Sequence, residues 1–370
     1  MHTDYQKKKK IVNLLLLLLI VLFIFLTETF TSFNIEADAD TILIIDEFTI
    51  PILTYHKFCT GDSQDVYTIH ITRFEQQMAY LKNNGYQVIS IVQLLKCIEN
   101  NVFPKKPVII TIDDGFKSVY SLAFPVLKEY GFPATLFLYT DFIGNGPNQL
   151  SWQEIREMID AGMEIGSHTL SHSNLLNMKK KESHMDYLKR INQEILLSRE
   201  ILERNTGSLV QSFAYPYGVY SQEIKMLAKQ AGYQALLNVN SMNNSIPIDK
   251  YSLNRQIIPA SCSIKQFENI LKEKTLMVND IFPADGTVTN NQEIKIGVVL
   301  NDPLVQQNLL YFRLSGFGLH DYTYSHELQE ISFTPVAPKL LQKRTWIAQI
   351  AARDIETGEQ RKVSWLFTIR

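Results

Sequence analysis

Residues 108–115 have the sequence Val-Ile-Ile-Thr-Ile-Asp-Asp-Gly, an apolar run that ends in two adjacent carboxylates and a glycine. This pattern predicts a short strand over Val108–Ile112 that ends in a turn. Adjacent aspartates at a strand end are costly unless they bind a cation or stay in solvent, because like charges repel and burial disfavours both charged forms. Asp113 and Asp114 indicate either a cation site or a plain turn, and the Asp-Asp-Gly tripeptide alone favours the turn.

Similar short apolar runs recur on both sides of this stretch, between about residues 49 and 272, and amphipathic helical patterns lie between them. Strands that alternate with helices predict a parallel sheet, and seven such units suit a barrel at least as well as an open sheet. Functional groups are then expected where strands end and loops begin. The seven predicted strands are Ile52–Tyr55, Val88–Ser90, Val108–Ile112, Ala134–Leu138, Glu164–Gly166, Ser212–Tyr215 and Ala235–Leu237.

Residues 276–370 show strand patterns with no helical periodicity between them. Turn signals such as Asp285-Gly286 separate the apolar runs. We therefore predict an all-β, immunoglobulin-like sandwich of about ninety-five residues, with Trp346 and Trp365 in its core. Its expected role is a stalk or support for the preceding domain, and contact with the cell envelope or matrix is the alternative.

The amino terminus has the pattern of an exported protein. Lys7–Lys10 precede Ile11–Leu26, sixteen residues whose only polar member is Asn13. That length falls between a signal-peptide core of roughly 7–15 residues and a spanning helix of about 20. We expect residues 1–30 to form an uncleaved membrane anchor, with a cleaved signal peptide as the close alternative. Residues 31–48 are then a linker, and the rest of the chain lies outside the cytoplasm.

Composition excludes other classes of protein. The 370 residues include 36 basic and 38 acidic side chains, for a net charge of −2, so nothing indicates nucleic-acid binding. Three cysteines without a CxxC pair form neither a disulfide framework nor a cysteine zinc site.

The sequence Ser167-His168-Thr169-Leu170-Ser171-His172 follows a predicted strand and contains two of the eight histidines. Histidines at i and i+4 have the spacing of a two-histidine metal clamp, although a chance exposed pair is about equally frequent. Together with Asp114 they form a two-histidine, one-carboxylate set, which suits catalytic Zn²⁺ or another borderline divalent metal. This combination is much more specific than either part alone.

A third cluster, Tyr215-Pro216-Tyr217-Gly218, also follows a predicted strand. Proline and glycine around an aromatic residue predict a rigid turn that can present a backbone N–H and a ring. From spacing alone, a plain turn with packed tyrosines is the better interpretation.

Together these clusters resemble the motifs of polysaccharide deacetylases of the NodB-homology type, carbohydrate esterase family 4, over about residues 51–260. The resemblance implies a distorted (β/α) barrel over 49–272 that removes N-acetyl groups from N-acetylglucosamine polysaccharides. It looks closest to the branch that acts on poly-β-1,6-N-acetylglucosamine in biofilm matrix. The matching segments are Asp113-Asp114, His168 with His172, Tyr215-Pro216-Tyr217-Gly218, Leu53-Thr54-Tyr55-His56, Phe132-Pro133-Ala134-Thr135-Leu136-Phe137, Leu150-Ser151-Trp152 and Gly166-Ser167-His168-Thr169.

The resemblance also implies a role for each matching residue. The metal ligands are Asp114, His168 and His172, and Asp113 accepts the proton of the attacking water. The backbone N–H of Tyr217 is the expected oxyanion donor. The sugar subsites are expected to be walled by Tyr215, Pro216 and Trp152, with Tyr217 beside them.

Two departures from the family pattern concern the catalytic acid and the orienting arginine. Ala214 stands where other branches carry an arginine that orients the catalytic aspartate, and Arg255 is expected to take over that role. The late Leu-x-His motif that supplies the acid is missing, since no histidine lies between His184 and His320. His56, at the end of the first predicted strand, is the candidate acid, and a partly buried packing role is its alternative.

Two further functions stay open. The same metal and base suit an O-acetyl-glycan esterase or a peptidoglycan deacetylase, because an ester needs less help from an acid. A protein of another class, a surface glycan-binding or matrix protein with weak catalysis, is the third interpretation. A near-neutral charge fits a neutral glycan in each case.

Overall fold

The computed structural model describes residues 48–370 except 307–309, 316–317, 320–321 and 336–339. The predicted anchor, and the predicted linker up to residue 47, lie outside the described residues. Within the described ranges, no helix combines the length and apolar character needed to cross a membrane.

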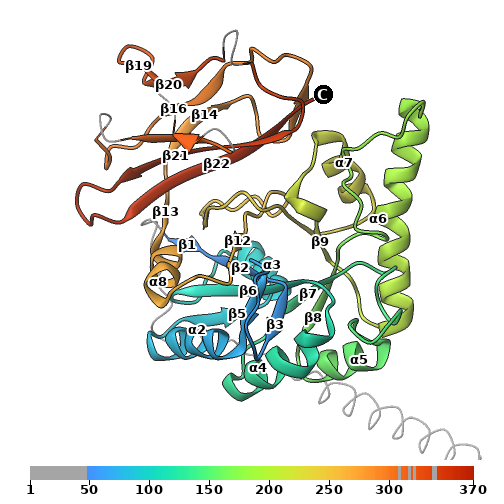
Figure 1. Cartoon of the computed structure of the whole chain (residues 1–370). Coiled ribbons are helices and arrows are strands. Elements are labelled where there is room, and N and C mark those ends of the chain that lie inside the picture. The colour runs from blue at the N-terminus through green and yellow to red at the C-terminus, as the bar shows by residue number, and fades with distance from the viewer. Residues whose placement is uncertain (1–47, 307–309, 316–317, 320–321, 336–339) are drawn as a thin grey trace, which may run out of the picture. The chain divides into compact units, whose positions relative to one another are not determined.

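A parallel sheet forms the centre of residues 49–272 (Figure 1). Seven strands follow one path in the order β10, β9, β8, β7, β6, β2 and β12, and β5 pairs with β6 beside that path. Leu237 at the end of β10 bridges Leu253 in parallel, just before β12, which curls the two edges toward each other. The predicted distorted (β/α) barrel is thus confirmed. The strands are β2 (Ile52–Tyr55), β5 (Gln87–Ile89), β6 (Pro107–Asp114), β7 (Thr135–Leu138), β8 (Glu164–Ser167), β9 (Ser212–Ala214), β10 (Ala235–Leu237) and β12 (Gln256–Ile257).

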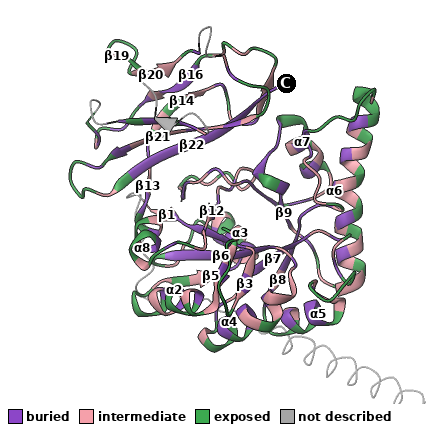
Figure 2. Ribbon diagram, viewed as in Figure 1, coloured by how far each residue is buried: buried purple, intermediate pink, exposed green. Residues whose placement is uncertain are grey.

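Helices alternate with these strands and begin at clear capping residues. Ser90, Ser151 and Ser263 each accept a hydrogen bond from the third residue of the helix that follows, whose Glu or Gln side chain bonds back. The apolar stripes of these helices pack against the barrel strands in two hydrophobic clusters, and Figure 2 shows their residues as buried. The helices are α2 (Ile71–Asn83), α3 (Ile91–Asn100), α4 (Phe124–Tyr130), α5 (Trp152–Asp160), α6 (His184–Thr206), α7 (Gln222–Gln230) and α8 (Ile264–Lys272).

The carboxy-terminal region is rich in strands and contains two sheets. Their facing residues share one core, in which Trp346 and Trp365 are fully buried as predicted. An immunoglobulin-like topology stays a prediction. The strands are β13 (Lys274–Thr275), β14 (Val278–Phe282), β15 (Thr287–Thr289), β16 (Ile296–Leu300), β17 (Tyr311–Leu314), β18 (Gly318–Leu319), β19 (Thr323–Ser325), β20 (Glu330–Phe333), β21 (Thr345–Arg353) and β22 (Gln360–Ile369).

The barrel and the carboxy-terminal region belong to one compact unit of the described chain. Leu366 of β22 packs into the hydrophobic cluster of the barrel. The Lys362 ammonium lies 2.8 Å from the Glu273 carboxylate, which joins β22 to the end of the last barrel helix. The two regions are therefore packed against each other through both apolar and ionic contacts.

Candidate metal and active site

The candidate site lies where parallel strands end, as predicted from their alternation with helices. Asp113 and Asp114 are the last two residues of β6, and His168 directly follows β8. Asp114 and His172 have positive φ angles of 77° and 57°, which only a few per cent of non-glycine residues adopt. The backbone therefore turns sharply at both residues, and their side chains reach one point.

Asp114, His168 and His172 form a cluster that fits a divalent metal ion. Their ligand atoms all lie within 4.8 Å of one another. Asp114 Oδ1 lies 3.4 Å from His172 Nε2 and 3.9 Å from His168 Nε2, and this buried oxygen has no hydrogen-bond partner. An orphaned carboxylate oxygen between two imidazole nitrogens, at distances too long for good hydrogen bonds, leaves space for an ion.

The tautomer of His168 is set by the backbone. Its Nδ1–H donates to the carbonyl oxygen of Ala214 at 2.7 Å, so its Nε2 lone pair is directed at the cluster. Burial lowers the pKa of His168 to about 3 and also lowers the pKa of His172. Both imidazoles are therefore neutral near pH 7, the form that binds a metal.

Burial and the adjacent Asp113 charge raise the pKa of Asp114 to about 6. Each of two neighbouring carboxylates raises the pKa of the other unless a nearby cation compensates their charge. The donor set and its electrostatics thus favour a bound cation.

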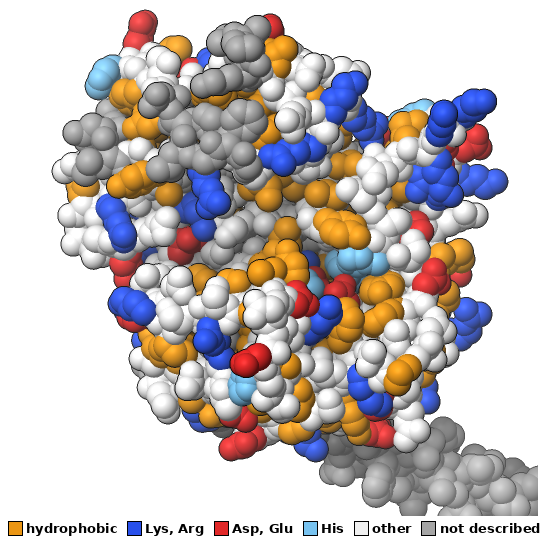
Figure 3. Space-filling view, in the orientation of Figure 1, with side chains coloured by type: hydrophobic (Ala, Val, Ile, Leu, Met, Phe, Trp, Pro, Cys, Tyr) orange, Lys and Arg blue, Asp and Glu red, His pale blue; other side chains and the backbone are white. Residues whose placement is uncertain are grey.

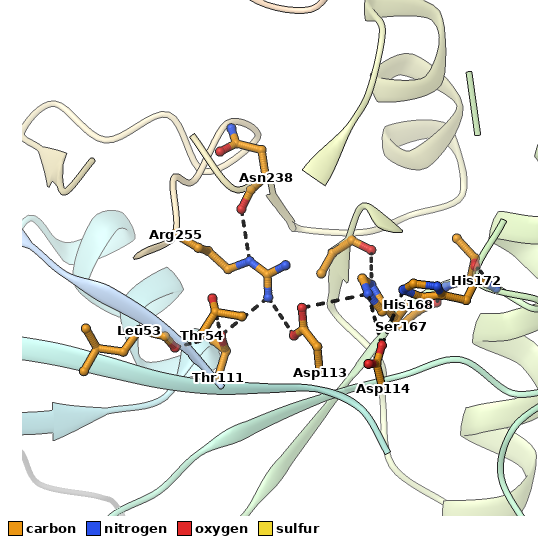
Figure 4. A network of polar contacts seen from close by, with 12 residues as sticks. Leu53, Thr54, Thr111, Asp113, Asp114, Ser167, His168, His172, Asn238 and Arg255 are labelled. Carbon is orange, nitrogen blue, oxygen red and sulfur yellow. Dashed lines mark hydrogen bonds and ion pairs between the residues drawn. The ribbon is translucent and has the colours of Figure 1, made fainter. Parts of the chain in front are cut away.

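Asp113 is held by a buried arginine. Arg255 Nη1 lies 2.7 Å from Asp113 Oδ1, and Arg255 Nε donates to the backbone carbonyl of Asn238 at 3.0 Å. Burial alone would raise the pKa of Asp113, but the Arg255 guanidinium outweighs it and keeps that pKa below its usual value. Figure 4 shows Arg255 and the histidines approaching the carboxylates from opposite sides. The structure thus brings the predicted orienting arginine to the predicted base.

The 3₁₀ turn Pro216–Gly218 forms another wall of the site. Tyr217 has a φ of 58°, is 60% exposed, and places its ring centroid 4.8 Å from that of His172. Gly218 also has positive φ, and a Cβ there would lie 2.0 Å from Val239 Cγ2, so only glycine fits. The turn therefore has a fixed shape beside the Asp114, His168 and His172 cluster.

His56 directly follows β2, the neighbour of β6 in the sheet. Its ring lies 5.0 Å from that of Tyr67, and its charge lowers the pKa of both Asp113 and Asp114. This proximity is consistent with a place at the site. Its role as acid stays a prediction.

The prediction that Tyr215 and Pro216 wall a sugar subsite is wrong. Tyr215 is 1% exposed and stacks on Tyr220, and Pro216 is buried too, so neither offers a surface to a glycan. The reason is that both follow β9 directly and pack into the barrel, while the next residue alone turns outward. Trp152 is half-buried at the start of α5, and its place at a subsite stays a prediction.

The sequence patterns missed Tyr139, which follows β7 and lies with its ring 5.0 Å from that of His172. Burial and the nearby Asp114 charge raise its pKa to about 12, so its hydroxyl stays protonated. Its position after a predicted strand was the available signal.

In the face shown in Figure 3, histidine and acidic side chains meet in a hollow bordered by hydrophobic side chains.

Comparison with known families and proteins gives several matches to this part of the chain. The family model described as polysaccharide deacetylase matches residues 100–236. A putative polysaccharide deacetylase of Bacillus subtilis, YxkH, is 31% identical over 186 residues, which are 50% of this chain and 62% of that protein. The poly-β-1,6-N-acetyl-D-glucosamine N-deacetylase of Staphylococcus epidermidis is 29% identical over 213 residues, 56% of this chain and 72% of that protein.

Solved structures agree on the fold. The Streptococcus pyogenes deacetylase PplD has a TM-score of 0.55 and 25% identity, over 61% of this chain and 99% of its own. The polysaccharide deacetylase BC0361 from Bacillus cereus has a TM-score of 0.53 and 27% identity, over 61% of this chain and 70% of its own. Residues 100–236 of this chain therefore match the polysaccharide deacetylase family, and the barrel around them has the fold of solved polysaccharide deacetylases.

Proposed function

We propose that this protein is a metal-dependent N-deacetylase of N-acetylglucosamine polysaccharides, with poly-β-1,6-N-acetylglucosamine as its substrate. The observation that carries the proposal is the Asp114, His168 and His172 cluster beside the Asp113–Arg255 pair, at the strand ends of a deacetylase barrel. The names of the staphylococcal relatives support the choice of glycan.

Asp114, His168 and His172 would hold the ion, and Zn²⁺ suits this donor set best. When bound, the ion supplies Lewis-acid polarisation of the acetyl carbonyl and lowers the pKa of a water. Asp113 accepts the proton of the attacking water, and Arg255 keeps that carboxylate ionised and fixed in direction.

The remaining roles belong to the rim of the site. The Tyr217 backbone N–H is proposed to donate to the oxyanion, since the strained turn holds that residue beside His172. His56 is proposed to protonate the departing amine. Tyr217 and Tyr139 are the proposed aromatic contacts of the sugar, because their rings flank His172.

We also propose that the enzyme works outside the cytoplasm. The basic flank Lys7–Lys10 and the apolar run Ile11–Leu26 support an amino-terminal membrane anchor or signal peptide. Contact with the cell envelope or matrix through the carboxy-terminal region belongs to the same proposal.

The test is acetate release from poly-β-1,6-N-acetylglucosamine oligomers, before and after chelation and after Zn²⁺ is added back. We expect the chelator to abolish release and the metal to restore it. His168→Ala/His172→Ala should be inactive and should bind no stoichiometric metal. His184→Ala is the matched control, because that exposed histidine pairs with Glu223 away from the cluster.

Full activity of the double variant would disprove the metal assignment. Acetate release from O-acetylated glycans alone, or from peptidoglycan alone, would make that glycan the substrate in place of poly-β-1,6-N-acetylglucosamine. Glycan binding without any release would instead favour a surface-binding protein.

A further inference from the structure

The carboxy-terminal region contributes a carboxylate to the barrel at Asp285, in the turn between β14 and β15. Asp285 Oδ2 accepts hydrogen bonds from the Tyr220 hydroxyl at 2.6 Å and from Asn240 Nδ2 at 2.9 Å. Its Oδ1 accepts from the backbone N–H of Leu366 at 2.9 Å. One carboxylate thus joins β22 to two separate barrel loops.

The first of these loops is the turn beside the metal cluster. The Tyr220 ring is 1% exposed and stacks on Tyr215, with centroids 4.9 Å apart and planes 14° from parallel. Tyr215 in turn accepts a hydrogen bond from the backbone N–H of Gly218 at 2.8 Å, which closes the turn that carries Tyr217. A side chain at Gly286 would lie 2.9 Å from the Tyr220 ring, so the contact is close.

The second loop leads to the proposed base. Asn240 is 1% exposed, and its backbone N–H donates to Asn238 Oδ1 at 2.8 Å. The carbonyl of Asn238 accepts from Arg255 Nε, and Arg255 is paired with Asp113. Hydrogen bonds through Asn240 and Asn238 therefore connect the Asp285 carboxylate to Arg255, which orients the proposed base.

We propose that Asp285 is a positioning residue for the reaction, through which the carboxy-terminal region holds both the Tyr217 turn and the Arg255–Asp113 pair in working geometry. The inference rests on the proposed deacetylase function. It gives the carboxy-terminal region a part in the active barrel, beyond that of a stalk.

The experiment compares Asp285→Ala with Asp354→Ala. Asp354 is a buried carboxylate of the same region that pairs with Arg361 inside the β core, away from both loops. We expect Asp285→Ala to lower kcat by about 10- to 100-fold with little change in KM, since small displacements of catalytic groups act on the rate. Asp285→Asn, which keeps an acceptor, should recover part of kcat. Asp354→Ala should keep the kcat of its folded fraction.

A second measurement, amide hydrogen exchange, needs no activity. Exchange over 215–218 and 238–240 should be faster in Asp285→Ala than in Asp354→Ala. Unchanged kcat and unchanged exchange in Asp285→Ala would overturn the proposal, as would an equal loss of kcat in both variants. If the wild-type protein releases no acetate, the proposed function fails, while the exchange comparison still decides whether Asp285 holds the two loops.

Discussion

The barrel and the carboxy-terminal region each bury one arginine beside aspartates, with different consequences. Arg255 and Arg361 are both 1% exposed, and each lies 2.7 Å from a carboxylate oxygen. Arg361 faces two buried carboxylates, Asp302 and Asp354, in the strand-rich region. Arg255 instead faces Asp113 alone, whose second oxygen lies 3.8 Å from His168. A buried arginine–aspartate pair alone thus does not distinguish the candidate active site; the pair found there also adjoins the Asp114, His168 and His172 cluster, which fits a metal ion.

The strongest test of this difference changes one aspartate of each pair to asparagine. Asp113→Asn should lower kcat by about 100- to 10,000-fold, because the amide cannot accept the water proton. Asp302→Asn should leave kcat unchanged. Acetate release by the purified variants measures both, and similar losses in the two proteins would remove the distinction.

Removal of Arg361, the buried arginine of the carboxy-terminal region, should affect stability more than catalysis. Arg361→Leu leaves Asp302 without its arginine and Asp354 with only the Lys274 ammonium, 3.9 Å away. Breaking a buried ion pair in this way typically lowers the free energy of unfolding by about 3–5 kcal/mol. Urea unfolding measures this change, and the activity of the folded fraction serves as control. An unchanged unfolding midpoint would contradict the structural role of Arg361.

Acidification should weaken the same region through Asp354. Burial alone would raise its pKa, but the backbone N–H groups of residues 356 and 357 and Arg361 lower it from 3.8 to about 2. A lowered pKa means that this stabilisation is complete above about pH 4 and is lost as the pH falls toward 2. The lowered pKa of Asp354 corresponds to roughly 2 kcal/mol of the free energy of unfolding. Unfolding measured from pH 6 to pH 2.5 should therefore show a shallower acid loss in Asp354→Asn than in wild type, and parallel curves would refute it.

The sequence patterns predicted the barrel because its strands are short, apolar and regularly separated by amphipathic helices. They missed β12, since two residues are too few to form a pattern and its pairing with β2 depends on the closed sheet. The grouping of Asp114 with His168 and His172 followed from strand ends that meet at one edge. The burial of Tyr215 could not be predicted, because it depends on Tyr220 and on packing that only the folded barrel supplies.

Contacts between residues distant in the chain were the hardest to predict from the sequence. Arg255 lies 142 positions from Asp113 in the chain, and only the departure from the family pattern pointed to it. Asp285 looked like an ordinary Asp-Gly turn in a strand-rich region. Its contacts with Tyr220 and Asn240 join segments that no local periodicity connects.

Thr169 carries a consequence for the evolution and engineering of this enzyme. It has a φ of 73°, which is unfavourable for a β-branched residue, yet its hydroxyl accepts the backbone N–H of His172 at 2.9 Å. Glycine at this position would relieve the strain but would also remove this hydrogen bond. The change would thereby loosen the loop that carries His172, a proposed metal ligand, so backbone strain and loop anchoring make opposite demands on a single side chain.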